Sequence, residues 1–169
     1  SVICYNGRRK LDQDLKYIFI SKSSEETKRV AERLAGFLFP GAVITLDGPL
    51  GSGKTTFVGG VAKGLDILER VISPTFNIMK CYFEARLPMF HIDAYRLENR
   101  DSELGLEEFI EGDGVTLIEW PDYIKPLIPA SHLRIVIKAL DENSRRITFE
   151  NIGSAYEQVV KNLKETENV

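Results

Sequence analysis

Apolar and polar positions follow two different spacings along the chain, and each spacing predicts one kind of element. Short apolar or alternating runs predict strands. These runs occupy residues 17–21, 42–47, 77–83, 89–93, 115–119, 133–139 and 145–150. Apolar residues three or four positions apart predict helices. They occupy residues 24–38, 54–65, 99–110 and 154–164, the third as one or two short helices.

The order of these segments predicts the fold class. Two pairs of strands are joined by turns too short for a parallel crossover, which indicates antiparallel hairpins: 77–83 with 89–93, and 133–139 with 145–150. Helices separate most of the other strands. We therefore expect an α/β fold in a single domain, with a mixed parallel/antiparallel sheet and helices covering both of its faces.

The limits of this domain follow from where the periodic pattern begins and ends. The pattern covers residues 17–164, which we expect to form the domain. Residues 1–16 are largely polar and aperiodic, so we expect an N-terminal extension there. Residues 165–169 form a polar tail in this interpretation.

Composition and charge narrow the possible functions. The chain has 169 residues, with 43% hydrophobic residues, 28% charged residues and a net charge of −3. This balance does not indicate the basic surface of a protein that binds nucleic acid directly. Cys4 and Cys81 lack metal-ligand spacing, which favours a reducing compartment. With no signal-peptide pattern and no membrane-spanning apolar run, we expect a cytoplasmic protein.

The segment between strand 42–47 and helix 54–65 carries the clearest chemistry. It reads GPLGSGKT and matches G-x-x-x-x-G-K-[ST], a loop whose backbone N–H groups and following helix N-terminus hold phosphates. The expected cradle is Gly48, Pro49, Leu50, Gly51, Ser52, Gly53, Lys54 and Thr55. Lys54 would reach the β- and γ-phosphates of a nucleoside triphosphate, and the Thr55 hydroxyl would bind Mg²⁺.

Hydrolysis of a bound nucleotide needs a further metal ligand and a group that orients water. Glu119 ends the apolar strand 115–119 in the manner of a Walker B element, although Asp is more usual there. Asp93 ends strand 89–93 in the same way. Ligands of such sheets lie beyond the carboxyl ends of the strands. We therefore expect one acid to hold Mg²⁺ and the other to position water, with both assignments open.

One loop and two single residues near these elements have a less specific interpretation. Ser73, Pro74 and Thr75 form either a simple turn or a switch loop whose Thr75 hydroxyl senses the γ-phosphate through Mg²⁺. Trp120 packs beside the nucleotide or fills the core. His91 is expected to pack within its strand or to form a local hydrogen bond, and we assign it no chemistry.

Helix 54–65 contains three glycines, Gly59, Gly60 and Gly64. Each costs roughly 0.5–1 kcal/mol relative to Ala inside a helix. We expect that they allow this helix to pack closely against the sheet. Close approach of a partner chain is the alternative.

Together, these motifs resemble those of the TsaE family, also called YjeE. Its members are small bacterial P-loop ATPases that act in the synthesis of threonylcarbamoyladenosine (t6A) in tRNA. The resemblance runs from about residue 19 to residue 149, and residues 1–16 lie outside it. It includes GPLGSGKTT at 48–56, SPTF at 73–76, HIDAYR at 91–96, GLEEF at 105–109 and LIEWP at 117–121. Ala94 departs from the bulkier apolar residue expected at its position.

The resemblance implies a P-loop NTPase-like domain that binds ATP or ADP with Mg²⁺. It implies that Thr55 and Glu119 bind the metal, and that Asp93 completes a hydrolytic site together with Lys54. It also implies that the loop containing Thr75 is a switch.

The resemblance further extends the nucleotide-binding set to Thr56. Ser24 and Arg145 would lie near the base or sugar, and Trp120 beside the phosphates. The implied activity is an ATPase that is weak without its partners. Those partners would be TsaB and TsaD homologues, with tRNA an indirect partner and no role for a membrane.

Two other classes of protein carry a phosphate loop of this kind. A small-molecule kinase needs an acceptor pocket and usually a lid that bears Arg, whereas residues 97–112 are strongly acidic and would suit an anionic acceptor poorly. A GTP-dependent switch of the Ras type carries an Asn-Lys-x-Asp element, which this sequence lacks. The kinase is therefore the main alternative to the ATPase.

Overall fold

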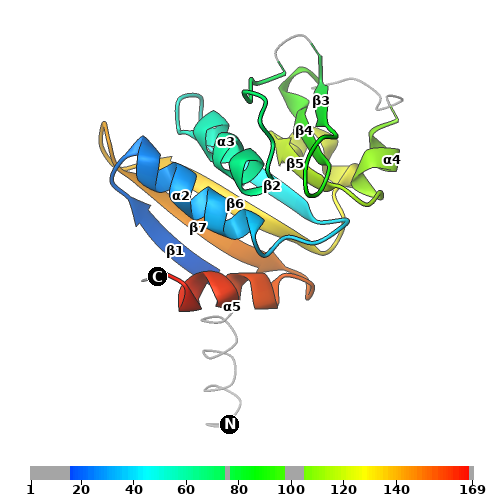
Figure 1. Ribbon diagram of the computed structural model, residues 1–169. Coiled ribbons are helices and arrows are strands. Elements are labelled where there is room, and N and C mark those ends of the chain that lie inside the picture. Colours follow the sequence, from blue (N-terminus) through cyan, green and yellow to red (C-terminus); the bar gives the residue numbers. More distant parts are fainter. Residues whose placement is uncertain (1–15, 75–76, 98–104, 168–169) are drawn as a thin grey trace, which may run out of the picture.

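The computed structural model describes residues 16–74, 77–97 and 105–167 (Figure 1). Its strands are β1 (Lys16–Ser21), β2 (Val43–Asp47), β3 (Met79–Tyr82), β4 (Met89–Asp93), β5 (Val115–Glu119), β6 (His132–Ala139) and β7 (Arg145–Ile152). Its α-helices are α2 (Ser24–Ala35), α3 (Lys54–Gly64), α4 (Leu106–Ile110) and α5 (Glu157–Glu165). Two 3₁₀ helices, η1 (Ala94–Leu97) and η2 (Pro121–Leu127), complete the described elements. The predicted extension covers residues 1–16, of which residues 1–15 lie outside the described part. Lys16 was wrongly included, because it is the first residue of β1 and pairs with Glu150 of β7.

The described strands form one mixed sheet in the order β1-β7-β6-β2-β5-β4-β3. Strands β6, β2, β5 and β4 are parallel neighbours in its centre. The β3–β4 and β6–β7 pairs are antiparallel, as expected from their short turns, and β1 adds antiparallel to β7. The predicted α/β fold with a mixed sheet is therefore confirmed.

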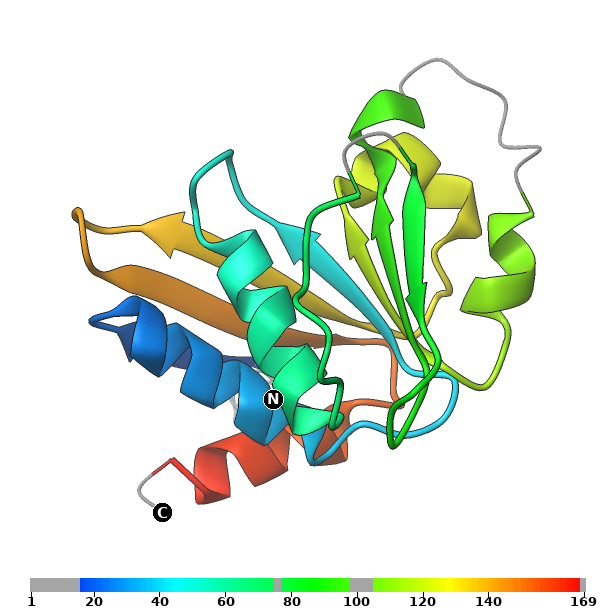
Figure 2. The same ribbon diagram turned by 45° about the horizontal axis from the view of Figure 1, so that its top comes forward.

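Helical segments cover both faces of the sheet, and the side-chain alternation of the strands decides which residues each layer buries. Ile44 and Leu46 of β2 join the larger core, to which α2, α3 and α5 contribute. Val43 of β2 and Ile118 of β5 join a second core beneath η1, α4 and η2. Figure 2 shows α2 and α3 in front of the sheet, with η2 behind β4 and β5. Strands β2 and β5 are buried on both faces, which explains their continuous apolar sequences.

Helix α2 begins at a capping box formed by Ser23 and Glu26, and its first turn borders the phosphate loop. The Glu26 backbone N–H donates to Ser23 Oγ at 3.1 Å. The Glu26 carboxylate in turn accepts from the Lys22 backbone N–H at 2.7 Å, one residue earlier than in the standard box. These bonds fix the entry of α2 and thereby the position of Ser24.

The glycines of α3 permit close packing against helix α2, which corrects the expectation of close packing against the sheet. A Cβ added at Gly60 would lie 2.5 Å from the Lys28 carbonyl oxygen. One added at Gly64 would lie 2.4 Å from the Ala35 Cβ. No atom outside the immediate chain neighbourhood lies within 4 Å of a Cβ added at Gly59. Two of the three glycines therefore have a packing role between helices.

Several element ends differ from the sequence prediction. Helix α2 ends at Ala35 rather than at residue 38, and Leu38 is buried in the core although it lies beyond the end of the helix. Helix α5 begins at Glu157 rather than at 154, and it continues to Glu165, into the predicted tail. Part of the predicted helix 99–110 lies outside the described residues, and the described part is helical from Leu106.

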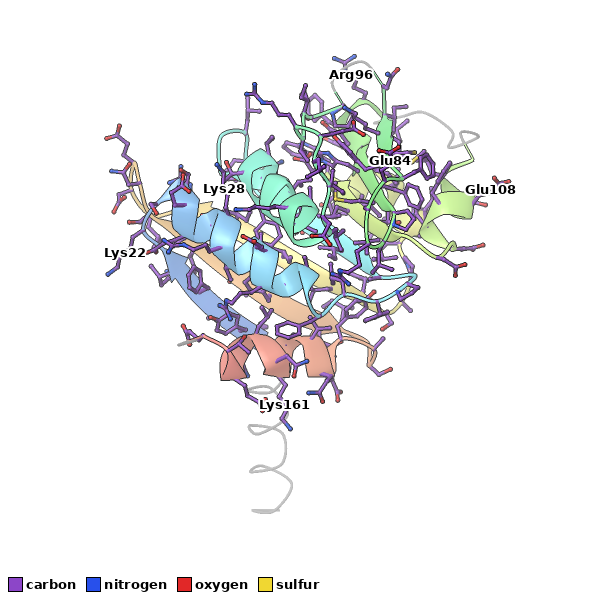
Figure 3. All side chains as sticks on the ribbon, in the orientation of Figure 1. Lys22, Lys28, Glu84, Arg96, Glu108 and Lys161 are labelled. Carbon is purple, nitrogen blue, oxygen red and sulfur yellow. The ribbon has the colours of Figure 1, made fainter. Side chains whose placement is uncertain are left out.

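The surface carries most of the charge. In Figure 3 the labelled Lys22, Lys28 and Lys161 side chains project away from the ribbon. Within the described residues, no helix is both long and apolar enough to cross a membrane.

Candidate active site

The phosphate loop connects the end of β2 to the first turn of α3. Gly53 takes the N-cap position of α3 with φ 104°, a left-handed conformation that glycine adopts without strain. This cap supplies no side-chain hydrogen bond, so the first N–H groups of the helix remain available to an anion. Ser52 Oγ is buried and has no hydrogen-bond partner among the described residues. The loop therefore presents donors suited to phosphate oxygens.

A buried row of three polar side chains lies beside the start of α3. Lys54 Nζ lies 3.8 Å from Glu119 Oε1. The other carboxylate oxygen, Oε2, lies 2.6 Å from His91 Nε2. Lys54 is 7% exposed, Glu119 4% and His91 0%, so each group depends on the others for its polar contacts.

The parallel pairing of the central strands explains why these residues meet. Leu46, at the end of β2, pairs with Glu119 at the end of β5. Asp93, at the end of β4, pairs with Glu119 from the other side. The two predicted acids are therefore neighbours at the sheet edge from which the phosphate loop departs.

Asp93 is more open to solvent than Glu119 and is held by local contacts. Its Oδ1 accepts from the Tyr95 backbone N–H at 3.1 Å. Its Oδ2 lies 3.5 Å from Ser73 Oγ, at the base of the predicted switch loop. Thr75 itself lies outside the described residues, so the structure does not place its hydroxyl.

The donor set here suits Mg²⁺ rather than a metal held by protein alone. Thr55, the second residue of α3, has an exposed side chain, while Glu119 and Asp93 supply carboxylates. Across residues 16–74, 77–97 and 105–167, no three or more His, Cys, Asp or Glu side chains gather into a metal cage. Mg²⁺ commonly takes one or two protein ligands together with phosphate oxygens and water. The hydroxyl and the carboxylates fit that pattern.

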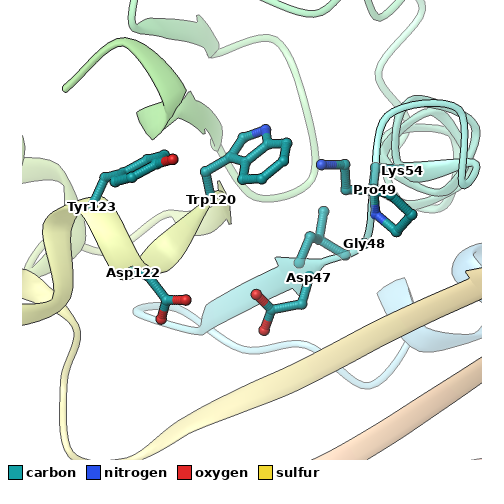
Figure 4. A pocket seen from close by; sticks show the side chains of 8 residues that line it. Asp47, Gly48, Pro49, Lys54, Trp120, Asp122 and Tyr123 are labelled. Atoms are coloured by element: carbon teal, nitrogen blue, oxygen red, sulfur yellow. The ribbon is translucent and has the colours of Figure 1, made fainter. Parts of the chain in front are cut away.

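An aromatic cavity opens next to Lys54 (Figure 4). Its volume is about 470 Å³, and Trp120 and Tyr123 form one wall with stacked rings whose centroids lie 6.3 Å apart. Trp120 takes a left-handed conformation, φ 56°, which aims its ring at Lys54. The Lys54 ammonium lies 4.2 Å from the ring centroid, within cation–π range. Asp47 and Asp122 line the same cavity.

A second, smaller cavity of about 150 Å³ lies on the opposite side of the loop, between α2 and the β6–β7 turn. The residues that line it include Ser24, Gly53, Thr56, Asn143 and Arg145. Arg145 Nε donates to the Ser52 carbonyl at 2.9 Å, and Arg145 Nη1 donates to the carbonyls of the turn. Ser24 and Arg145, remote in sequence, therefore meet at one end of the phosphate loop.

Comparison with known proteins agrees with this geometry. The family model described as "Threonylcarbamoyl adenosine biosynthesis protein TsaE" matches residues 21–147. A Bacillus subtilis (strain 168) protein named tRNA threonylcarbamoyladenosine biosynthesis protein TsaE is 46% identical over 145 residues, which cover 86% of this chain and 92% of the relative.

The chain belongs to the TsaE family. A TsaE relative from Nostoc sp. (strain PCC 7120) is 39% identical over 80% of this chain and 85% of its own length. The crystal structure of Bacillus subtilis YdiB superposes with a TM-score of 0.81 and 40% identity. It covers 90% of this chain and 97% of that one.

Within this TsaE-family chain, sequence reasoning underestimated one residue. His91 was expected to pack or bond locally, yet it forms a hydrogen bond to Glu119 on the neighbouring strand. The signal was the alternation of strand β4: His91 and Asp93 are two positions apart and so share a face. Sequence reasoning also did not identify Asp47, Asp122 and Tyr123 as lining residues of the aromatic cavity.

Proposed function

We propose that this TsaE-family protein binds ATP with Mg²⁺, hydrolyses it weakly, and supports t6A modification of tRNA together with TsaB and TsaD homologues. The observation that carries the proposal is the convergence of Lys54, Glu119 and the free N–H groups of α3 at one end of the phosphate loop. Relatives named for t6A biosynthesis support the pathway. Modification of tRNA would place the protein in the cytoplasm.

The roles of the individual residues follow from their positions. The first N–H groups of α3 and the Lys54 ammonium would bind the β- and γ-phosphates. Thr55 and Glu119 would hold Mg²⁺, which when bound neutralises charge on the phosphate oxygens. Asp93, at the neighbouring strand end, would orient the attacking water. Thr75 would contribute from the switch loop.

The weak turnover proposed for the isolated chain is consistent with the hydrogen bonds that Arg145 forms. Phosphoryl transfer is accelerated when an Arg stabilises the charge of the transition state. Arg145 contacts the loop, but its Nε and Nη1 groups donate to backbone carbonyls instead. In this proposal a partner protein supplies that stabilisation, which suits an ATPase that works within a complex.

The principal alternative is a small-molecule kinase, and one structural observation supports it. The aromatic cavity beside Lys54 has room for a small acceptor. The charged residues that line it are Lys54, which is assigned to the nucleotide phosphates, Asp47, which pairs with Arg134 at 3.3 Å, and Asp122. Carboxylates at this position would repel an anionic acceptor.

Nucleotide binding can be measured by intrinsic tryptophan fluorescence, because Trp120 is the only tryptophan of the sequence and lies against Lys54. We expect ATP with Mg²⁺ to change the fluorescence of Trp120, and ATP to bind more tightly than GTP. Preference for GTP would contradict the proposal. A phosphorylated small-molecule product would favour the kinase.

The pathway assignment needs its own experiment. The purified chain is mixed with TsaB and TsaD homologues, with and without ATP, and capture and ATP hydrolysis are measured in the same samples. We expect capture that depends on ATP and hydrolysis faster than that of the chain alone. Glu119→Gln, which keeps the shape and removes the charge, should retain part of the ATP binding and lose hydrolysis. Turnover by this variant equal to that of the parent protein would make Glu119 structural.

A further inference from the structure

We propose that His91 is a positioning residue: it holds one oxygen of the Glu119 carboxylate and leaves the other directed at Lys54 and the metal position. This inference rests on the proposed function, because it gives Glu119 the role of a Mg²⁺ ligand. His91 itself would touch neither nucleotide nor metal.

The geometry divides the two oxygens of Glu119 between two partners. Oε2 lies 2.6 Å from His91 Nε2, and Oε1 lies 3.8 Å from Lys54 Nζ. A carboxylate fixed in this way offers one oxygen to the site instead of rotating between several arrangements. Hydrogen-bonded partners of metal ligands act by fixing ligand orientation, and their loss typically costs about 10–100-fold in metal affinity or activity.

Burial of His91 determines which ring nitrogen carries the proton. The side chain is fully buried, and Nδ1 has no hydrogen-bond partner among the described residues. A proton on Nδ1 would leave a buried donor unpaired and turn the Nε2 lone pair toward a carboxylate. A proton on Nε2 instead donates to Glu119 and leaves only a lone pair unsatisfied. The neutral ring therefore holds its proton on Nε2.

His132, the other histidine of the sequence, provides an internal reference. Its Nδ1 lies 2.8 Å from the carbonyl oxygen of Pro129, a group that can only accept. We therefore expect the proton of His132 on Nδ1. The two histidines should show opposite tautomers in a ¹⁵N NMR spectrum of the imidazole nitrogens of the intact protein at neutral pH. A neutral His91 ring that carries its single proton on Nδ1 would overturn the proposal, whether or not any variant folds.

Two substitutions separate positioning from packing. His91→Gln keeps an N–H donor at the distance of Nε2 along the side chain, whereas His91→Asn places its donor at the position of Nδ1, short of Glu119. We expect His91→Asn to raise the Mg²⁺ concentration needed for half-maximal ATP binding by about tenfold or more, read from Trp120 fluorescence. We expect His91→Gln to stay within about threefold of the parent. His132→Asn is the matched control at the other histidine.

The outcomes distinguish this inference from the proposed function. If the parent protein shows no Mg²⁺-dependent ATP binding, the proposed function fails, while the NMR spectrum still tests the contact between His91 and Glu119. If the parent binds and folded His91→Asn requires no more Mg²⁺ than the parent, the positioning role fails and the proposed function stands. In a Glu119→Gln background, His91→Asn should produce no further change, because the residue through which it acts is already altered.

Discussion

The two ends of the phosphate loop are built in different ways. At the end near β4 and β5, polar side chains meet one another in a dry environment: Lys54, Glu119 and His91 are all less than a tenth exposed. At the end near the β6–β7 turn, Arg145 contacts the loop through the Ser52 backbone carbonyl, and Asn143 of the turn is exposed. We call these the phosphate end and the hairpin end.

This difference indicates that one loop can have a hydrolytic end that is sensitive to substitution and a nucleotide-binding end that tolerates substitution. Charges in a water-excluded site interact strongly, and removal of one partner is strongly destabilising because it leaves the other charge buried and unpaired. Contacts made by an exposed turn are individually worth less and tolerate change better. We therefore expect the loss of Lys54 or of the Glu119 charge to suppress turnover strongly, and substitutions at the hairpin end to adjust nucleotide affinity.

The largest effect is expected for Lys54→Ala. The substitution removes the cation expected at the γ-phosphate and leaves Glu119 buried without its ammonium partner. We expect ATP turnover to fall by about 100-fold or more, the range for losing one charge-stabilising group. Lys63→Ala, on the same helix but exposed and paired with Glu32, should leave turnover unchanged. Unchanged turnover in Lys54→Ala would remove the phosphate end from the proposed mechanism.

A pair of glycine substitutions tests whether helix packing supports the phosphate end. Gly60→Ala forces a Cβ against the Lys28 carbonyl and the Ala31 Cβ, and we expect it to lower the free energy of unfolding by about 1–3 kcal/mol. Gly59→Ala meets open space, and we expect it to raise the free energy of unfolding by about 0.5–1 kcal/mol. Urea denaturation measures both. Equal effects of the two substitutions would show that the contact between α2 and α3 is not tight.

A smaller effect is expected at the hairpin end from Arg145→Ala. The variant loses the hydrogen bond to the Ser52 carbonyl and the bonds that close the turn. We expect ATP affinity to fall about fivefold, corresponding to about 1 kcal/mol, with the Mg²⁺ requirement unchanged. Fluorescence titration measures both quantities. Arg146→Ala, at the next and exposed position of β7, is the control, and a fall in its ATP affinity equal to that of Arg145→Ala would contradict the assignment.

The smallest effect is a local pH dependence of the turn. The backbone N–H groups of Asn143 and Ser144 donate to Asp141 Oδ1 and hold the pKa of this carboxyl below its ordinary value of 3.8. The ionised form is the one that is stabilised. The contribution is therefore present above pH 3.8 and is lost as the pH falls through the lower pKa of the folded protein.

Amide NMR shifts of Asn143 and Ser144 followed from pH 6 to pH 2 should report this transition. Asp141→Asn should remove it, because the amide does not ionise in that range. A transition that persists in Asp141→Asn would assign the dependence to another group.

The sequence by itself determined the local features of this protein. Apolar spacing predicted every strand of the described sheet, and the glycine-rich motif with its flanking strand and helix predicted the phosphate loop. Asp93 and Glu119 were found because each ends an apolar run, a property that is visible along the chain. Helix ends were less predictable: Leu38 follows the helical spacing of α2 yet is buried beyond the end of the helix.

Tertiary structure decided which of these features meet. Parallel pairing brings Asp93, Glu119 and the end of β2 to one edge, and only that register places His91 within hydrogen-bonding distance of Glu119. The same holds for Gly60, whose constraint comes from a helix about thirty residues earlier. Burial and partner choice depend on the residues brought close by strand order and helix packing, and periodicity within one segment carries no information about those neighbours.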